Sequence, residues 1–153
     1  MASSPSAVEV KVTAEMLAIF AQLVEWPSND GPNSLTLCVL GHDPVEAELP
    51  AVFQNKRIDG KSIQLLMQPK GISTLACDIA FISRDEATSA RKQLSQLRKS
   101  GVLTVSNAPE FLEAGGHIGL FLEDGRMRFE FNPDAAKRSS IKVSSRLAKL
   151  AVI

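Results

Sequence analysis

The sequence predicts an α/β fold, a single three-layer domain with a mixed, mostly parallel sheet, helices on both faces and a C-terminal antiparallel hairpin. Apolar, strand-like runs alternate with capped helical segments through the first two-thirds of the chain, which is typical of a helix-covered parallel sheet. An Asp124-Gly125 turn between two alternating runs indicates the hairpin. The 153 residues suffice for one core, so we expect a disordered tail over 1–10 and one domain over 11–153.

The first helix is expected to begin at Thr13, which suits an N-cap, and to end before Pro27. Its apolar residues fall on one face at helical spacing: Met16, Leu17, Phe20, Leu23 and Val24. A strand follows over 35–40. Asp43, with Pro44 and Glu46 behind it, then has the pattern of a capped short helix.

The middle of the chain repeats the strand-helix order. Asp59-Gly60 indicates a tight turn into a strand over 63–67, and 77–83 is the clearest central strand. Asp85 is expected to cap a helix that ends at Gly101. The sequence places its apolar stripe on Ala87, Ala90, Leu94 and Leu97, and a solvated basic face on Arg91, Lys92, Arg98 and Lys99.

The last third begins with a strand over 102–106 and a short helix from Asn107 to the glycines at 115–116. In the hairpin, over 117–123 and 126–131, one face is expected to be core and the other charged. The core face would carry Ile118, Leu120, Leu122, Met127, Phe129 and Phe131. Two short helices should follow, the first over 133–139 and the last capped by Ser144 or Ser145.

The charge composition argues against two classes of partner. The chain has 17 basic and 17 acidic side chains, so no net charge draws it to nucleic acid or to an acidic membrane. No apolar run approaches the roughly 20 residues of a membrane span. We therefore expect neither nucleic-acid binding nor membrane insertion.

Motifs of catalysis are missing from the sequence. It contains no nucleophile elbow, no phosphate loop and no dinucleotide fingerprint. The glycine-rich stretch at 115–119 leads from a helix into a strand, which is the reverse of a phosphate loop. His42 and His117 have no carboxylate or cysteine at metal-ligand spacing. We expect no enzyme, metal or cofactor, and a hydrolase using His42 is only a minor alternative.

Both cysteines, Cys38 and Cys77, lie in apolar strand-like runs. Two free core cysteines and one disulfide are equally compatible with that placement. The first seven residues lack the basic and apolar regions of a signal peptide. They are compatible both with a cytosolic protein and with a mature exported protein whose signal peptide has been removed.

Four segments in this order resemble the YfiR family of periplasmic regulators. The first, at 25–27, is Glu-Trp-Pro, and the second, at 37–44, runs from the strand into Gly-His-Asp-Pro. The third is Gly-Gly at 115–116 followed by the hairpin at 118–132 with Phe-Glu-Phe-Asn, and the fourth is the Ser-Ser-Arg-Leu segment at 144–151. Each segment alone is weak, but the ordered set spans nearly the whole chain.

The resemblance implies a periplasmic protein that inhibits a membrane-bound diguanylate cyclase through the periplasmic sensor domain of that enzyme. It also implies that an outer-membrane lipoprotein can sequester the inhibitor, that the inhibitor forms homodimers and that no cofactor is needed. A disulfide between Cys38 and Cys77 is implied as well. Some members carry a second, C-terminal cysteine pair, which this chain lacks.

Three residues are candidate partner contacts. Glu130 points opposite Phe129 and Phe131, and it is either a partner contact or an ordinary exposed charge. Trp26, the only tryptophan, is either a core residue, which we favour, or an interface anchor. Arg146 opens a helix, where a cation is unfavourable, which suggests a carboxylate partner. The alternative function is a periplasmic small-molecule sensor with an apolar pocket near Trp26 or the C-terminal hairpin.

Overall fold

A computed structural model describes residues 6–26, 34–58, 60–69 and 76–151, without the side chains of 88–92 and 98. A seven-stranded sheet forms its centre. In spatial order the strands are β3 (Arg57–Ile58), β4 (Lys61–Met67), β2 (Ser34–Leu40), β5 (Ile79–Ile82), β6 (Leu103–Ser106), β7 (Ile118–Glu123) and β8 (Arg126–Phe131). The five inner strands are parallel, and β3 and β8 pair antiparallel at the two ends. The predicted mixed, mostly parallel sheet is confirmed.

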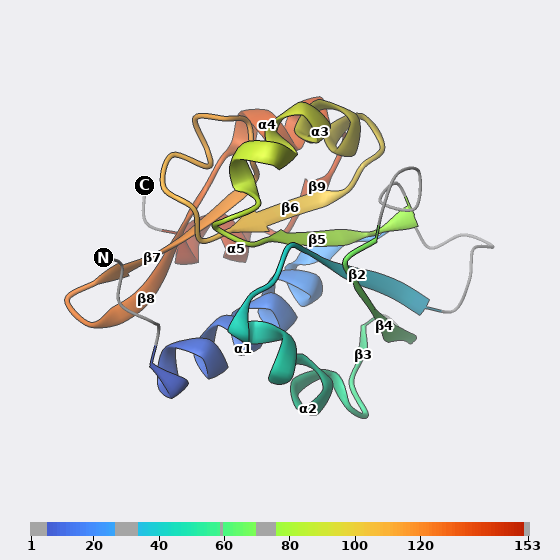
Figure 1. Ribbon diagram of the computed structural model, residues 1–153. Coiled ribbons are helices and arrows are strands. Elements are labelled where there is room, and N and C mark those ends of the chain that lie inside the picture. The colour runs from blue at the N-terminus through green and yellow to red at the C-terminus, as the bar shows by residue number, and fades with distance from the viewer. Residues whose placement is uncertain (1–5, 27–33, 59, 70–75, 152–153) are drawn as a thin grey trace.

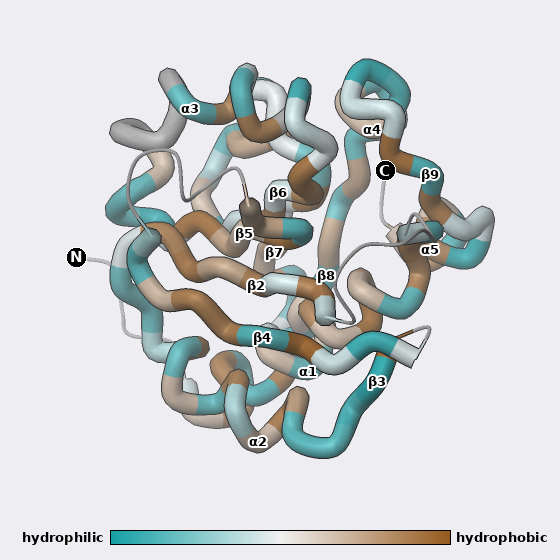
Figure 2. The backbone as a smooth tube through the Cα atoms, turned by 90° about the vertical axis from the view of Figure 1, so that its right-hand side faces the viewer, coloured by the Kyte–Doolittle hydropathy of each residue, from teal (hydrophilic) through white to brown (hydrophobic). Residues whose placement is uncertain are grey.

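Helices cover both faces of this sheet (Figure 1). They are α1 (Ala7–Leu23), the 3-10 helix η1 (Pro44–Ala47), α2 (Leu49–Phe53), α3 (Ala87–Lys99), α4 (Pro133–Arg138) and α5 (Ser145–Leu150). In Figure 1, α1 and α2 lie below the sheet, and α3 and α4 lie above it. The apolar strands β2 and β5 run between these layers in Figure 2. The three-layer arrangement is therefore as predicted.

The first helix begins earlier than predicted. Ser6 is its N-cap, and Ser6 and Glu9 form a capping box. Thr13 is buried inside the helix and donates its hydroxyl to the Glu9 carbonyl oxygen at 2.8 Å. The expected start at Thr13 was wrong because a threonine can bond back along a helix as well as cap it. Residues 6–10, expected in the tail, form the cap and first turn, and 1–5 lie outside the described residues.

A second, two-stranded sheet was not predicted. It pairs β1 (Val24–Glu25) with β9 (Lys142–Val143) in antiparallel register. The Ser144 amide donates to the Leu23 carbonyl oxygen at 2.7 Å beside it. These strands are too short to show a periodic pattern, and they fix the C-terminal segment against the end of α1.

The segment between β6 and β7 forms turns in place of the predicted helix. Glu110 has a φ of 63°, which is incompatible with the first turn of a right-handed helix. The amide of Gly116 donates to the Phe111 carbonyl oxygen at 3.0 Å. A Cβ on Gly116 would lie 2.1 Å from the Phe111 ring, so this tight return of the chain requires glycine.

The other predicted turns and caps largely hold. Asp43 caps η1 with a capping box to Glu46, and Ser144 caps α5. The Asp124-Gly125 turn has two positive φ angles and joins β7 to β8 as expected. β3 and β4 pair around the predicted Asp59-Gly60 turn, although Asp59 lies outside the described residues.

An apolar and a polar face were predicted for both the hairpin and α3. The hairpin departs from this prediction at Leu122, and α3 is described only in part. Leu122 is 49% exposed because the hairpin tip extends past the core. Of the α3 stripe, Leu94 and Leu97 are buried. The side chains of Ala90, Arg91, Lys92 and Arg98 lie outside the described ones.

His117 is fully buried, at 0% exposure, and connects three elements. The Thr104 amide donates to Nδ1 of His117 at 3.0 Å, and the Thr104 hydroxyl lies 2.8 Å from the same atom. Nε2 lies 2.9 Å from Oγ of Ser139, whose hydroxyl donates to the Ala135 carbonyl oxygen. Because Nδ1 accepts, Nε2 carries the proton and donates to Ser139. The ring thus joins β6 and the start of β7 to α4.

We expect His117→Ala to lower the free energy of unfolding by about 2 to 4 kcal/mol, because it leaves a cavity and unpaired buried groups on Thr104 and Ser139. Urea denaturation measures the change. His42→Ala is the control, since the His42 side chain is 81% exposed, and it should change stability by less than about 0.5 kcal/mol. Equal effects of the two substitutions would contradict the structural role of His117.

Candidate functional site

The carboxyl edge of the parallel strands is the usual position of a ligand site in an α/β sheet. The strands β4 and β5 follow β2 in the chain but flank it in the sheet, so the strand order reverses beside β2. Open α/β sheets bind ligands at such a point. Here it lies beyond Leu40 and Ile82, the last residues of β2 and β5.

The chain fills this edge with its own groups. Gly41, with a φ of 82°, lies so close to Ser83 that a Cβ would approach Oγ of Ser83 to 2.1 Å. The Gln68 side-chain amide donates to the Gly41 carbonyl oxygen at 2.6 Å and to Oε1 of Glu46 at 2.8 Å. The hydrogen-bonding groups that would hold a ligand are therefore used to join β2, β4 and η1.

Glu46 and His42 lie at this edge, where Glu46 is part of the N-terminal capping box of η1 and His42 lies beside it. Burial raises the pKa of Glu46, but hydrogen bonds from Gln68 and the Asp43 amide, together with nearby His42, lower this pKa below its ordinary value. Nδ1 of His42 is 3.6 Å from Oε2 of Glu46. Within the described residues, no group of three or more His, Cys, Asp or Glu side chains could hold a metal ion. The ionised Glu46 thus acts as a hydrogen-bond acceptor that closes η1.

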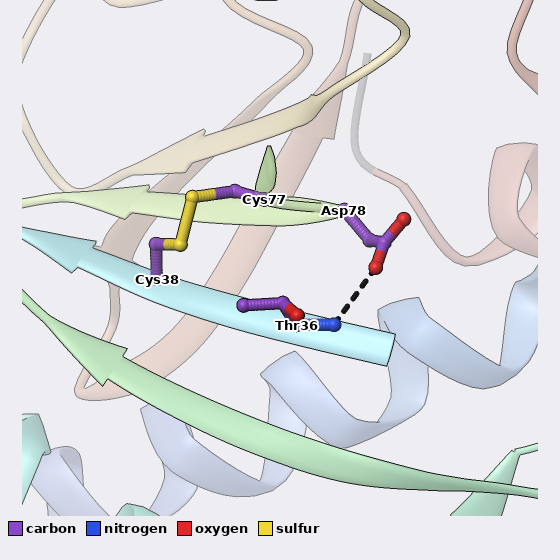
Figure 3. Close-up of a disulfide and its surroundings, with 4 residues drawn as sticks. All are labelled: Thr36, Cys38, Cys77 and Asp78. Carbon is purple, nitrogen blue, oxygen red and sulfur yellow. Dashed lines mark hydrogen bonds between the residues drawn. A yellow bond between two sulfur atoms is a disulfide. The ribbon is translucent and has the colours of Figure 1, made fainter. Parts of the chain in front are cut away.

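A disulfide joins Cys38 to Cys77, with the Cα atoms 5.9 Å apart (Figure 3). It connects the middle of β2 to the residues just before β5. The pairing that the family resemblance implied is present. Both cysteines are buried on the α3 side of the sheet, so the disulfide is a structural link between neighbouring strands.

Asp78 adds a polar clamp beside the disulfide. The Thr36 amide donates to Oδ2 of Asp78 at 2.8 Å (Figure 3). The Asp78 amide donates in turn to the Thr36 carbonyl oxygen, also at 2.8 Å. Burial raises the pKa of Asp78, and the Thr36 hydrogen bond and Lys61 offset only part of that rise. The clamp and the disulfide therefore both join β2 to the two residues directly before β5, Cys77 and Asp78.

An open site lies at the periphery, where β7 continues past β6. The two strands pair only at Val105↔Ile118 and Ser106↔Gly119, while β7 runs on to Glu123. The turns after β6 leave a groove of about 240 Å³ beside β7. We call it the hairpin groove, and its lining includes Arg84, Asn107, Pro109, Leu112, Gly119, Phe121 and Glu130.

Two hydrogen-bond acceptors line the hairpin groove. Oδ1 of Asn107 is buried and accepts no hydrogen bond from the described residues. Glu130 is exposed on β8, and it forms no ion pair with any described residue. A Cβ on Gly119 would lie 3.0 Å from Leu112, so a side chain there would narrow the groove. The groove therefore suits a ligand that brings an apolar group and hydrogen-bond donors.

Trp26 and Arg146 do not lie with Glu130. Trp26 is half-buried against the α1-side core, and its indole N–H donates to the Ala21 carbonyl oxygen at 2.8 Å. The favoured core packing of Trp26 thus agrees with the structure. Arg146 is exposed on the first turn of α5, and the described residues give it no ion pair. The partner roles predicted for all three residues stay predictions.

Sequence reasoning missed Asn107 and Gly119 as members of this groove. The sequence pattern assigns Asn107 to a helix cap and Gly119 to the close-packed entry of a strand. Both assignments used local pattern alone, whereas the groove depends on where β6 stops pairing with β7. An asparagine just after a central strand was the one available signal, since ligands collect at strand ends.

The fold and this groove define an α/β domain with a peripheral groove beside its C-terminal hairpin. The chain belongs to the YfiR/HmsC-like family, whose family model matches residues 10–152. This family comprises periplasmic, non-catalytic regulators of cyclic-di-GMP signalling. No curated protein matches the sequence. None of the described helices has the length and hydrophobicity needed to cross a membrane.

Replacing both Cys38 and Cys77 by alanine should lower the free energy of unfolding by about 3 to 4 kcal/mol, because the disulfide closes a loop with a sequence separation of 39. Urea denaturation of oxidised wild type and the double variant measures the difference. Adding a reductant should destabilise the wild type and leave the variant unchanged. A variant as stable as the wild type would show that the disulfide contributes little.

Proposed function

We propose that this protein is a periplasmic regulator that inhibits a membrane-bound diguanylate cyclase by binding the periplasmic sensor domain of the enzyme. Membership of the YfiR/HmsC-like family supports the regulatory role. The proposal assigns the binding surface to the hairpin groove. The lipoprotein that would sequester the inhibitor, and a homodimer, remain predictions from the same family.

The observation that carries the choice of surface is the pair of acceptors in the hairpin groove. Glu130 supplies a carboxylate and Asn107 an unpaired, buried carbonyl oxygen. A lysine or an arginine of the cyclase would pair with the Glu130 carboxylate, and a second N–H donor of the cyclase would be needed for the Asn107 oxygen. Phe121 and Leu112, which line the same groove, would pack against the apolar part of that residue. An apolar contact beside a charged one is typical of interface hot spots.

Inhibition then follows from differential binding. The sensor domain exchanges between active and inactive conformers, and a ligand that prefers the inactive one shifts the population toward it. A shift from 1:99 to 99:1 requires about 10⁴-fold tighter binding to the favoured conformer. The groove needs no chemistry for this task, only a shape and charge that one conformer matches.

Glu130→Ala should weaken binding to the periplasmic domain of a diguanylate cyclase from the same organism by about tenfold, because an N–H donor of the cyclase loses the Glu130 carboxylate as its acceptor. Isothermal titration calorimetry with the purified domain measures this change. Asn107→Ala should weaken binding in the same direction.

Glu113→Ala is the matched control, since Glu113 is an exposed glutamate on the neighbouring turn and outside the groove lining. It should bind like the wild type. If Glu130→Ala and Asn107→Ala also keep wild-type affinity, the hairpin groove is not the binding surface.

A further inference from the structure

The strand β8 has an unpaired edge. Among the described residues, it is the last strand of the sheet and pairs only with β7. The amide of Asn132 donates to the His117 carbonyl oxygen at 2.8 Å, which marks this pair as hydrogen-bonded. Hydrogen-bonded pairs alternate in an antiparallel ladder. The backbone N–H and C=O groups of Met127 and Phe129 therefore point away from β7.

An apolar groove of about 300 Å³ runs along this edge. We call it the edge groove, and it lies between β8, α1 and α5. Its lining comprises Met16, Ile19, Phe20, Leu150 and residues 126–129. Ile19 and Leu150 are 42% and 57% exposed, so the groove is open to solvent. An apolar channel beside unpaired backbone groups suits an extended polypeptide, which can add to a sheet as a further strand.

The two faces of β8 determine which residues such a strand would carry. Side chains alternate along a strand, so Met127 and Phe129 lie on the α1 face while Arg126 and Arg128 lie on the other. Phe129 stacks edge-on against Phe20 of α1, which fixes this assignment. Among the described residues, Arg128 has one ion pair, a solvent-exposed one with Glu123 at 3.6 Å, and such pairs contribute little to stability. Both arginines can therefore bind new carboxylates.

A second copy of the chain is a poorer match than a different protein. Antiparallel self-pairing centred on Met127 sets Arg126 of one copy opposite Arg128 of the other, and centring on Arg128 sets that residue opposite itself. Like charges directly opposite are destabilising. Centring on Phe129 pairs Arg128 with Glu130, but Phe129 is only 6% exposed. The accessible half of the edge thus favours acidic residues from another chain.

We propose that β8 binds an extended segment of a partner protein as an additional strand, and that this segment alternates acidic with apolar residues. The acidic residues pair with Arg126 and Arg128, and the apolar ones enter the edge groove beside Met127. The inference does not depend on the hairpin groove, because Arg126, Met127 and Arg128 do not line that groove.

Short blocked peptides test the proposal by NMR titration of the ¹⁵N-labelled full chain. One peptide alternates glutamate and valine, and the other alternates lysine and valine. The wild type should bind the glutamate peptide about tenfold more tightly, with shifts along β8. The double variant Arg126→Glu/Arg128→Glu should reverse this preference. Lys56→Glu, which changes an exposed lysine away from the edge, should keep the wild-type preference.

A backbone variant separates strand addition from simple charge attraction. Met127→Pro removes the outward N–H without removing a bond to β7, and proline is tolerated at such edge positions. This substitution should weaken binding of the glutamate peptide about tenfold. Circular dichroism checks that the variant keeps its fold. Equal binding of both peptides, no binding of either, or wild-type affinity in Met127→Pro would overturn the proposal. So would self-association of the wild type that Met127→Pro abolishes while neither peptide binds.

Discussion

The register of β2 between β4 and β5 is the constraint on which the rest of the structure depends. A hydrophobic core lies on each face of the sheet, and alternate residues of this strand belong to the two cores. Leu37 and Val39 pack on the α1 side, and Cys38 and Leu40 pack on the α3 side. A slip by one residue would exchange the two sets. The disulfide to Cys77 and the clamp between Thr36 and Asp78 both oppose that slip. Both helical layers therefore depend on the position of this one strand.

A fold fixed in this way leaves little freedom at its centre and places its accessible surfaces at the periphery. The carboxyl edge of the sheet is closed by Gly41 and Gln68, which use their polar groups on their own chain. The β7–β8 hairpin extends past the core, as Figure 1 shows on its left side. It supplies a wall to each of the two grooves. Binding at the hairpin can thus vary without disturbing the packing around β2.

Much of this architecture could be predicted from sequence because it is specified locally. The Asp43 cap, the Asp124-Gly125 turn and the apolar runs each carry a pattern within a few residues. The missed features depend on distant neighbours. Thr13 has the chemistry of a cap but bonds to Glu9 inside the helix, and nothing near His117 indicates its bonds to Thr104 and Ser139. The hairpin groove exists because β7 continues to Glu123 after its pairing with β6 stops at Ser106↔Gly119.

The most direct test is the rate of cyclic-di-GMP synthesis by a membrane-embedded diguanylate cyclase with a periplasmic sensor domain from the same organism. The purified protein is added on the periplasmic side of the reconstituted membrane. We expect synthesis to fall to a plateau as the protein saturates the sensor domain, and to stay constant for a cyclase truncated of that domain. Unchanged synthesis at saturating protein would contradict the proposed inhibition.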